Sequence, residues 1–164
     1  MAIPRRFLSF REHHDAWVSA WMAQAATGVR PVQRLALFDQ AFAALWRPAL
    51  ATLGELTLST AAGRALGEVA KAFPRLSSIQ VEATGLSFRD LREGGRATLD
   101  PELTEALRLL LVELLVTLGG LTGEALTPLL HRELARSGRT PGDDQAPAGS
   151  GARSGGGGGG GAST

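Results

Sequence analysis

The chain of 164 residues contains no cysteine and no tyrosine, and its only lysine is Lys71. The absence of cysteine excludes disulfide bonds, cysteine-ligated metal sites and thiol-based enzymes. The charge is almost balanced, with 17 Lys and Arg against 16 Asp and Glu and a formal net charge of +1. Because affinity for nucleic acids depends on a clustered excess of cations, this balance predicts no nucleic-acid partner.

Long apolar runs are missing as well. The most apolar stretch, residues 103–121, contains three charged side chains, whereas a membrane span needs about 20 mostly apolar residues. We therefore predict a buried helix there and no membrane span. Near the N-terminus, charges at Arg11 and Glu12 precede any apolar segment, which argues against a secretory signal. A cytoplasmic location is the resulting expectation.

The composition changes at residue 137. Ser, Gly and Pro dominate from there onward, and residues 155–161 are seven consecutive glycines. Such a segment buries too little apolar surface to offset the entropy lost on ordering. The sequence therefore predicts a helical domain over residues 1–136 and a disordered tail over residues 137–164. The tail is interpreted either as a spacer or as a dispensable terminus.

Apolar residues recur at helical spacing through most of the first 136 positions. Phe7, Phe10, His14, Trp17 and Trp21 are separated by 3, 4, 3 and 4 residues, which predicts one stripe of a helix. A similar stripe over residues 35–46 predicts a second helix, and the short Gly-Pro-containing connection predicts that the two pack antiparallel with matched aromatic seams. Further helices are expected over residues 49–58, 59–73, 101–118 and 122–133, with breaks at Pro48 and at Gly119-Gly120.

The spacing changes to strict alternation after residue 78. Ile79 and Val81 alternate with polar residues, as do Leu86 and Phe88 after Gly85, which predicts a β-hairpin within residues 78–99. An isolated hairpin is marginally stable, so it should pack against the helices. The expected fold class is mainly α: a compact bundle of about five helices with one short β-hairpin and a disordered Gly-rich tail.

The three histidines are the main candidates for chemistry. His13 and His14 are adjacent, and neighbouring helical residues point about 100° apart, so no metal site is predicted. His14 lies on the aromatic stripe and is a weak candidate for a haem ligand. The alternative is a buried histidine with a backbone or carboxylate partner, as buried polar groups require.

Motifs for other chemistries are incomplete. The segment around Ser87 lacks the second glycine of a nucleophile elbow, and the glycine-rich segment 119–124 lacks the lysine of a phosphate-binding loop. The glutamates are scattered without a spacing that would pair them. We therefore predict no catalytic residues, no enzymatic activity and no cofactor.

Apolar side chains remain in excess of any visible chemistry. Seven of the nine aromatics lie in the first two predicted helices, and the helix over 101–118 is rich in leucine. The leading hypothesis is a non-enzymatic protein–protein interaction or adaptor module with a regulatory role, which self-associates as a homodimer or larger oligomer or binds another protein. The alternative is a sensory domain that holds an apolar ligand or haem between the two aromatic helices. The predicted interaction residues are Trp17, Trp21, Phe38, Phe42, Trp46, Leu107, Leu111 and Leu114.

Overall fold

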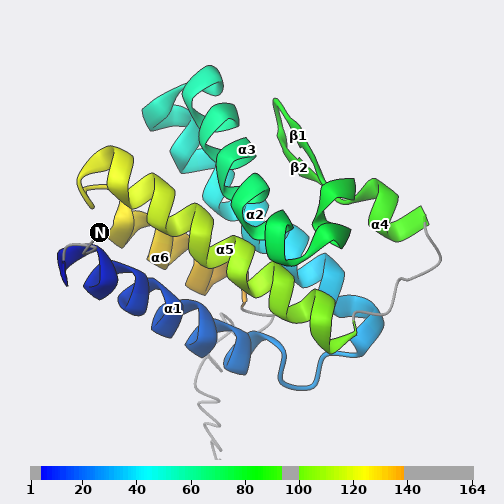
Figure 1. The fold of residues 1–164 in the computed structure, drawn as a ribbon. Helices are drawn as coiled ribbons and strands as arrows, with labels where there is room; N and C mark the ends of the chain where they lie inside the picture. The colour runs from blue at the N-terminus through cyan, green and yellow to red at the C-terminus, as the bar shows by residue number, and fades with distance from the viewer. Residues whose placement is uncertain (1–4, 94–99, 139–164) are drawn as a thin grey trace, which may run out of the picture.

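The computed structural model describes residues 5–93 and 100–138, with side chains described from residue 10 onward. Six α-helices dominate this part of the chain, with a short two-stranded hairpin at one end (Figure 1). The elements are α1 (Arg5–Ala25), α2 (Pro31–Leu53), α3 (Glu55–Ala72), the 3-10 turn η1 (Pro74–Ser78), β1 (Gln80–Glu82), β2 (Gly85–Ser87), α4 (Arg89–Glu93), α5 (Pro101–Thr122) and α6 (Thr127–Ser137). This architecture confirms the predicted fold class. The predicted tail lies outside the described residues, apart from its first two positions.

Helix α5 is the centre of the bundle. It lies between α1 and α3 and also packs against α6 and α2 (Figure 1). Leu107, Leu110, Leu111 and Leu115 are fully buried on it. A helix that is apolar around most of its circumference is stable only when other helices surround it, which explains its central place. Even so, no helix in the described part of the chain has both the length and the apolarity needed to cross a bilayer.

The predicted side-by-side packing of the first two helices is wrong. Helix α1 packs mainly against α5, whereas α2 packs mainly against α6. Trp21 and Phe38 meet near the connecting turn, with ring centroids 5.8 Å apart. Ion pairs of α1 with α5, such as Arg11 with Glu113 at 2.6 Å, hold α1 on the more apolar helix. The short connection fixed only the local reversal of the chain.

Two predicted helix breaks are also wrong. Pro48 lies inside α2, which continues to Leu53, because its buried neighbours Trp46 and Ala49 hold the helix in the core despite the missing N–H. The break comes at Gly54, whose φ of 81° is readily adopted only by glycine. Helix α3 therefore begins at Glu55, earlier than predicted.

The second misplaced break concerns α5. Gly119 and Gly120 lie within the helix, which ends where Gly123 adopts the left-handed conformation and its N–H bonds to the Gly119 carbonyl. Each glycine weakens the helix by about 1 kcal/mol relative to alanine, and burial of the surrounding leucines outweighs this cost. Consequently α6 begins at Thr127 and not at residue 122.

The hairpin is shorter than predicted. Val81 pairs with Leu86, and Glu82 pairs with Gly85 across a two-residue turn. The hairpin packs on α2 and α3, as expected for so short a sheet, and Trp46 Nε1 donates a hydrogen bond to the Ala83 carbonyl at 3.2 Å. Residues 89–93 form α4, so this part of the predicted hairpin is helical, and residues 94–99 lie outside the described residues.

Candidate functional site

Seven of the eight predicted interaction residues lie in the hydrophobic core. Their side chains pack against one another inside the chain, so this fold does not offer them to a partner. The seven are Trp21, Phe38, Phe42, Trp46, Leu107, Leu111 and Leu114. Trp17 is the exception, with 37% of its surface exposed at the edge of α1.

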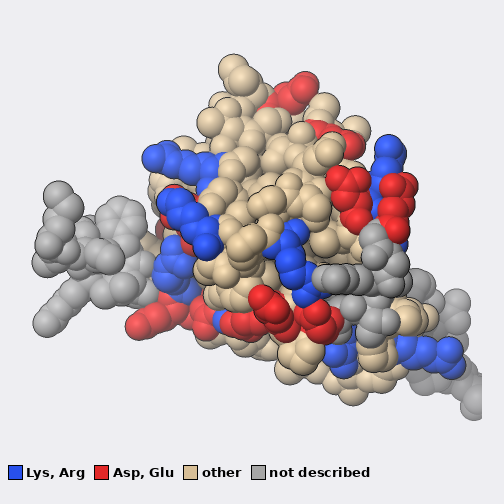
Figure 2. Space-filling view, turned by 45° about the vertical axis from the view of Figure 1, so that its right-hand side comes forward, with Lys and Arg blue, Asp and Glu red and all other residues tan. Residues whose placement is uncertain are grey.

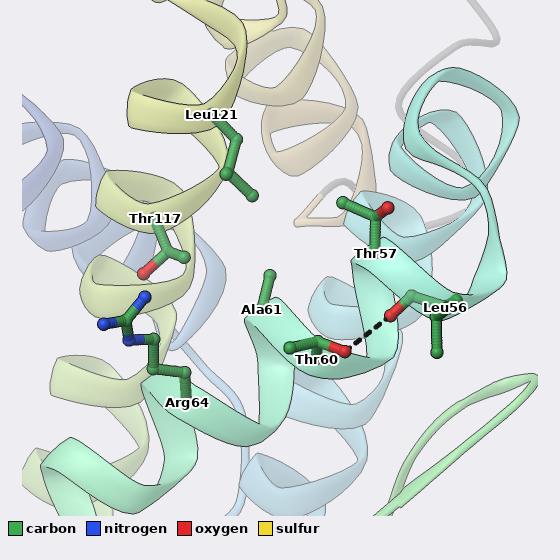
Figure 3. Close-up of a pocket in the computed structure, with 7 residues that line it drawn as sticks. All are labelled: Leu56, Thr57, Thr60, Ala61, Arg64, Thr117 and Leu121. Carbon is green, nitrogen blue, oxygen red and sulfur yellow. Dashed lines mark hydrogen bonds between the residues drawn. The ribbon is translucent and has the colours of Figure 1, made fainter.

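A groove between α3 and α5 is lined in part by two exposed leucines (Figure 3). Leu56, in the first turn of α3, is 82% exposed, and Leu121, in the last turn of α5, is 53% exposed. The space between the helices has a volume of about 290 Å³. This α3–α5 groove is lined by Leu56, Thr57, Thr60, Ala61, Arg64, Thr117 and Leu121.

Small side chains make the α3–α5 groove concave. Ala61 and Leu121 point into the space between the helices in Figure 3, with Thr117 beside them. The Thr60 hydroxyl donates to the Leu56 carbonyl at 2.8 Å, which keeps its polar atom on its own helix and leaves its methyl group to the surroundings. Arg64 is the single charged residue among the lining side chains. The groove thus suits apolar contact, and its lining contains no Asp, Glu or His side chain.

A second feature brings together all three histidines of the chain. His14 on α1 is fully buried, and its Nδ1 lies 3.0 Å from Nε2 of His131 on α6, although 117 residues separate them in the sequence. His14 Nε2 lies 3.4 Å from the Glu124 carboxylate, which in turn accepts a hydrogen bond from the Thr127 hydroxyl. The rings of His13 and His131 are 5.4 Å apart. We call His13, His14, His131 and Glu124 the histidine cluster.

The backbone at Glu124 is shaped to place its carboxylate. Glu124 is the one non-glycine residue with positive φ in the described part of the chain, at 66°. That conformation costs a side-chain-bearing residue about 1–2 kcal/mol. A Cβ atom on Gly119 would lie 2.5 Å from Glu124 Oε1, so any other residue at position 119 requires the carboxylate to shift from its observed place.

Burial dominates the electrostatics of this cluster. It lowers the pKa of His131 to about 4, helped by the neighbouring His14 and His13. Burial also lowers the pKa of His14, although the Glu124 carboxylate opposes this change. Both imidazoles are therefore neutral at pH 7. His14 contacts its two partners through opposite ring nitrogens, so these residues form a chain, and no three His, Asp or Glu side chains among the described residues converge on a metal position.

The outer end of the cluster opens into a groove between α1 and α6. Trp17 stacks on the His131 ring at 4.5 Å and covers one of its faces. The groove has a volume of about 510 Å³. This α1–α6 groove is lined by His13, Trp17, Thr127, Pro128, His131, Arg132 and Ala135.

The proposed haem role of His14 finds no space in this arrangement. Its two ring nitrogens face His131 and Glu124, and its side chain has no exposed surface. Helices α1 and α2 also pack against different partners, so the expected ligand site between their aromatic seams is not formed within the described residues.

Charges of both signs are interspersed on the surface. Figure 2 shows Lys and Arg side chains next to Asp and Glu around a largely uncharged area. Ion pairs account for several of these neighbours, including Arg75 with Asp100 and Arg92 with Asp39. The face in view therefore has no extended basic patch of the kind that binds nucleic acids.

Comparisons with known proteins add no family to this description: no protein-family model, curated protein or solved structure matches the chain.

The histidine cluster was missed by sequence reasoning because its members come from two distant segments. The one hint in the sequence was that two of the three histidines are adjacent on a predicted helix. Nothing in the sequence indicated the α3–α5 groove, because the sequence around Leu56 does not distinguish it from a buried leucine.

Proposed function

We propose that the chain is a non-enzymatic interaction module that associates with a second copy of itself through the α3–α5 groove. The observation that carries this proposal is the 82% exposure of Leu56 beside a groove lined mainly by apolar and small side chains. Contiguous exposed apolar surface on a small protein commonly marks an interaction site.

A second copy is the occupant that the shape of this surface favours. An exposed leucine borders the recess, and in a dimer with a two-fold axis the exposed leucine of each copy would face the recess of the other. Transferring a leucine side chain from water to an apolar contact is worth about 1.5–3 kcal/mol, and the symmetry makes the contact twice. The sensory alternative requires a ligand site between α1 and α2, and these helices pack mainly against different partners, α5 and α6.

Sedimentation equilibrium on the full chain over micromolar concentrations tests this proposal. We expect a reversible dimer, and we expect Leu56→Asp and Leu121→Asp to shift the chain to monomer because each places a charge in the apolar contact. Both residues are exposed, so the variants should retain the fold, as circular dichroism would verify.

Val32→Asp is the matched control. Val32 is also an exposed apolar residue, at 56%, but lies in the first turn of α2 and does not line the groove. Its substitution should leave the dimer unchanged. A wild-type chain that is monomeric throughout, or a dimer that survives both leucine substitutions, would overturn the proposal.

A further inference from the structure

The contacts of the histidine cluster indicate which nitrogen of each imidazole carries a proton. The Glu124 carboxylate lies 3.4 Å from His14 Nε2, which favours the tautomer of His14 that carries its proton at Nε2 and a lone pair at Nδ1. The His14 lone pair then requires an N–H at Nε2 of His131. Because neutral imidazole has one N–H, His131 keeps a lone pair at Nδ1.

That lone pair has no hydrogen-bond partner among the described residues, and His131 lines the α1–α6 groove. His13 lines the same groove from the neighbouring helix, and its side chain is exposed. Two imidazoles bound to one tetrahedral ion have ring centres about 5 Å apart, given metal–nitrogen distances of about 2.0 Å. The observed separation of the His13 and His131 rings is 5.4 Å.

We propose that His13 and His131 together bind a divalent transition-metal ion, such as Zn²⁺ or Cu²⁺, in the α1–α6 groove. Imidazole nitrogen is a preferred ligand for these ions, and water completes the coordination where the protein supplies only two ligands. The site is independent of the proposed dimer, because it lies on different helices from the α3–α5 groove.

The other two residues of the cluster, His14 and Glu124, are placed to orient the His131 ring. Metal-binding histidines usually donate their second N–H to a group that fixes the ring orientation, and here His14 and then Glu124 fill that role for His131. Trp17 holds the same ring by stacking. Arg132 also lines the groove and opposes a cation, but its guanidinium is exposed and therefore screened by solvent.

The test is a titration of the chelator-treated full chain with Zn²⁺, followed by calorimetry and by long-range ¹H–¹⁵N NMR of the imidazole nitrogens. With only three histidines and no cysteine in the chain, each imidazole signal can be assigned. We expect one ion per chain, with shifts at one nitrogen of His13 and at Nδ1 of His131. His13→Gln should weaken binding by about tenfold or more, because a second prepositioned ligand acts at high effective concentration.

Substitutions at the adjacent Gly119 and Gly120 test the orienting role of Glu124. Gly119→Ala forces the Glu124 carboxylate away from His14 without touching either ligand, and should weaken Zn²⁺ binding by about 10- to 100-fold. Gly120→Ala adds a methyl group in open space one residue later and should leave binding unchanged.

The proposal is overturned if the wild-type chain does not bind Zn²⁺, if wild type and His13→Gln bind it equally, or if only the His13 signal shifts. Equal affinity in the Gly119→Ala and Gly120→Ala variants would overturn the role assigned to Glu124.

Discussion

At the scale of single residues, burial divides the aromatic side chains of the N-terminal half into two groups. Phe42 is 2% exposed and contacts Phe88, with ring centroids 5.6 Å apart, whereas Trp17 is 37% exposed and stacks only on the rim of the core against His131. The sequence places both on apolar helical stripes and gives no basis for ranking them.

Truncating these two residues should therefore have different effects on the free energy of unfolding. We expect Phe42→Ala to cost about 3–5 kcal/mol, because it removes a large buried side chain and leaves a cavity. Trp17→Ala should cost about 1–2 kcal/mol, because it loses one aromatic contact and only part of a burial. Urea unfolding followed by circular dichroism measures both, and similar losses for the two variants would contradict this assignment.

The histidine cluster shows the limit of residue-level reasoning. The position of His14 on an apolar stripe predicts that it is buried with a polar partner. The identity of that partner could not be predicted, since His131 and Glu124 follow more than 100 residues later. Their approach depends on how α6 packs, which no local spacing encodes.

At the scale of secondary-structure elements, the capping signal at Asp100 was more reliable than the helix-breaking residues, although the starts of α3 and α6 were predicted wrongly. Asp100 caps α5 as its sequence indicates: its Oδ1 accepts a hydrogen bond from the Leu103 N–H at 2.7 Å, and Pro101 occupies the first turn. Pro48 and Gly119, in contrast, were expected to end helices and do not. A capping residue stabilises a helix through hydrogen bonds within a single turn, so it can be recognised from the local sequence. A proline or glycine ends a helix only if its cost in free energy exceeds the stabilisation from burying the rest of that helix.

The cap at Asp100 provides a prediction at this scale. Asp100→Ala should lower the free energy of unfolding by about 1–2 kcal/mol, because the Leu103 N–H loses its acceptor. Asp100→Asn is the matched variant: it retains a capping oxygen but loses the charge that pairs with Arg75 at 2.5 Å, so it should cost much less. Thermal or urea unfolding of the two variants decides the point, and equal losses would show that the ion pair, not the cap, is the main contribution.

At the scale of the whole molecule, charge pairs join the helix that begins the fold to its central helix. Arg108 on α5 binds Glu105 on its own helix at 2.7 Å and also Asp15 on α1. Its guanidinium lowers the pKa of Glu105 below the ordinary 4.5. The depressed pKa means that the unfolded chain takes up a proton on Glu105 at a higher pH than the folded chain does.

Acid should therefore weaken the fold in part through Glu105. Its contribution is complete above pH 4.5 and is lost as the pH falls through the lower folded pKa. Glu105 is 47% exposed, so screening limits this contribution to less than about 1 kcal/mol. Urea unfolding at a series of acidic pH values should show wild type approaching Glu105→Gln as the pH decreases. A difference between the two that stays constant with pH would contradict the prediction.

The sequence by itself determined the helical character of the chain, the hairpin that follows residue 78, the start of α5 and the central place of this helix. Each follows from short-range spacing or from apolarity on all sides of one segment. Tertiary structure alone decided that α1 packs on α5, that Trp21, Phe38, Phe42 and Trp46 are core while Trp17 is partly exposed, that Leu56 is exposed and that three histidines meet. These outcomes depend on which apolar surfaces, far apart in the sequence, pack against one another. The free energy of that packing involves several segments at once and cannot be read from any single one.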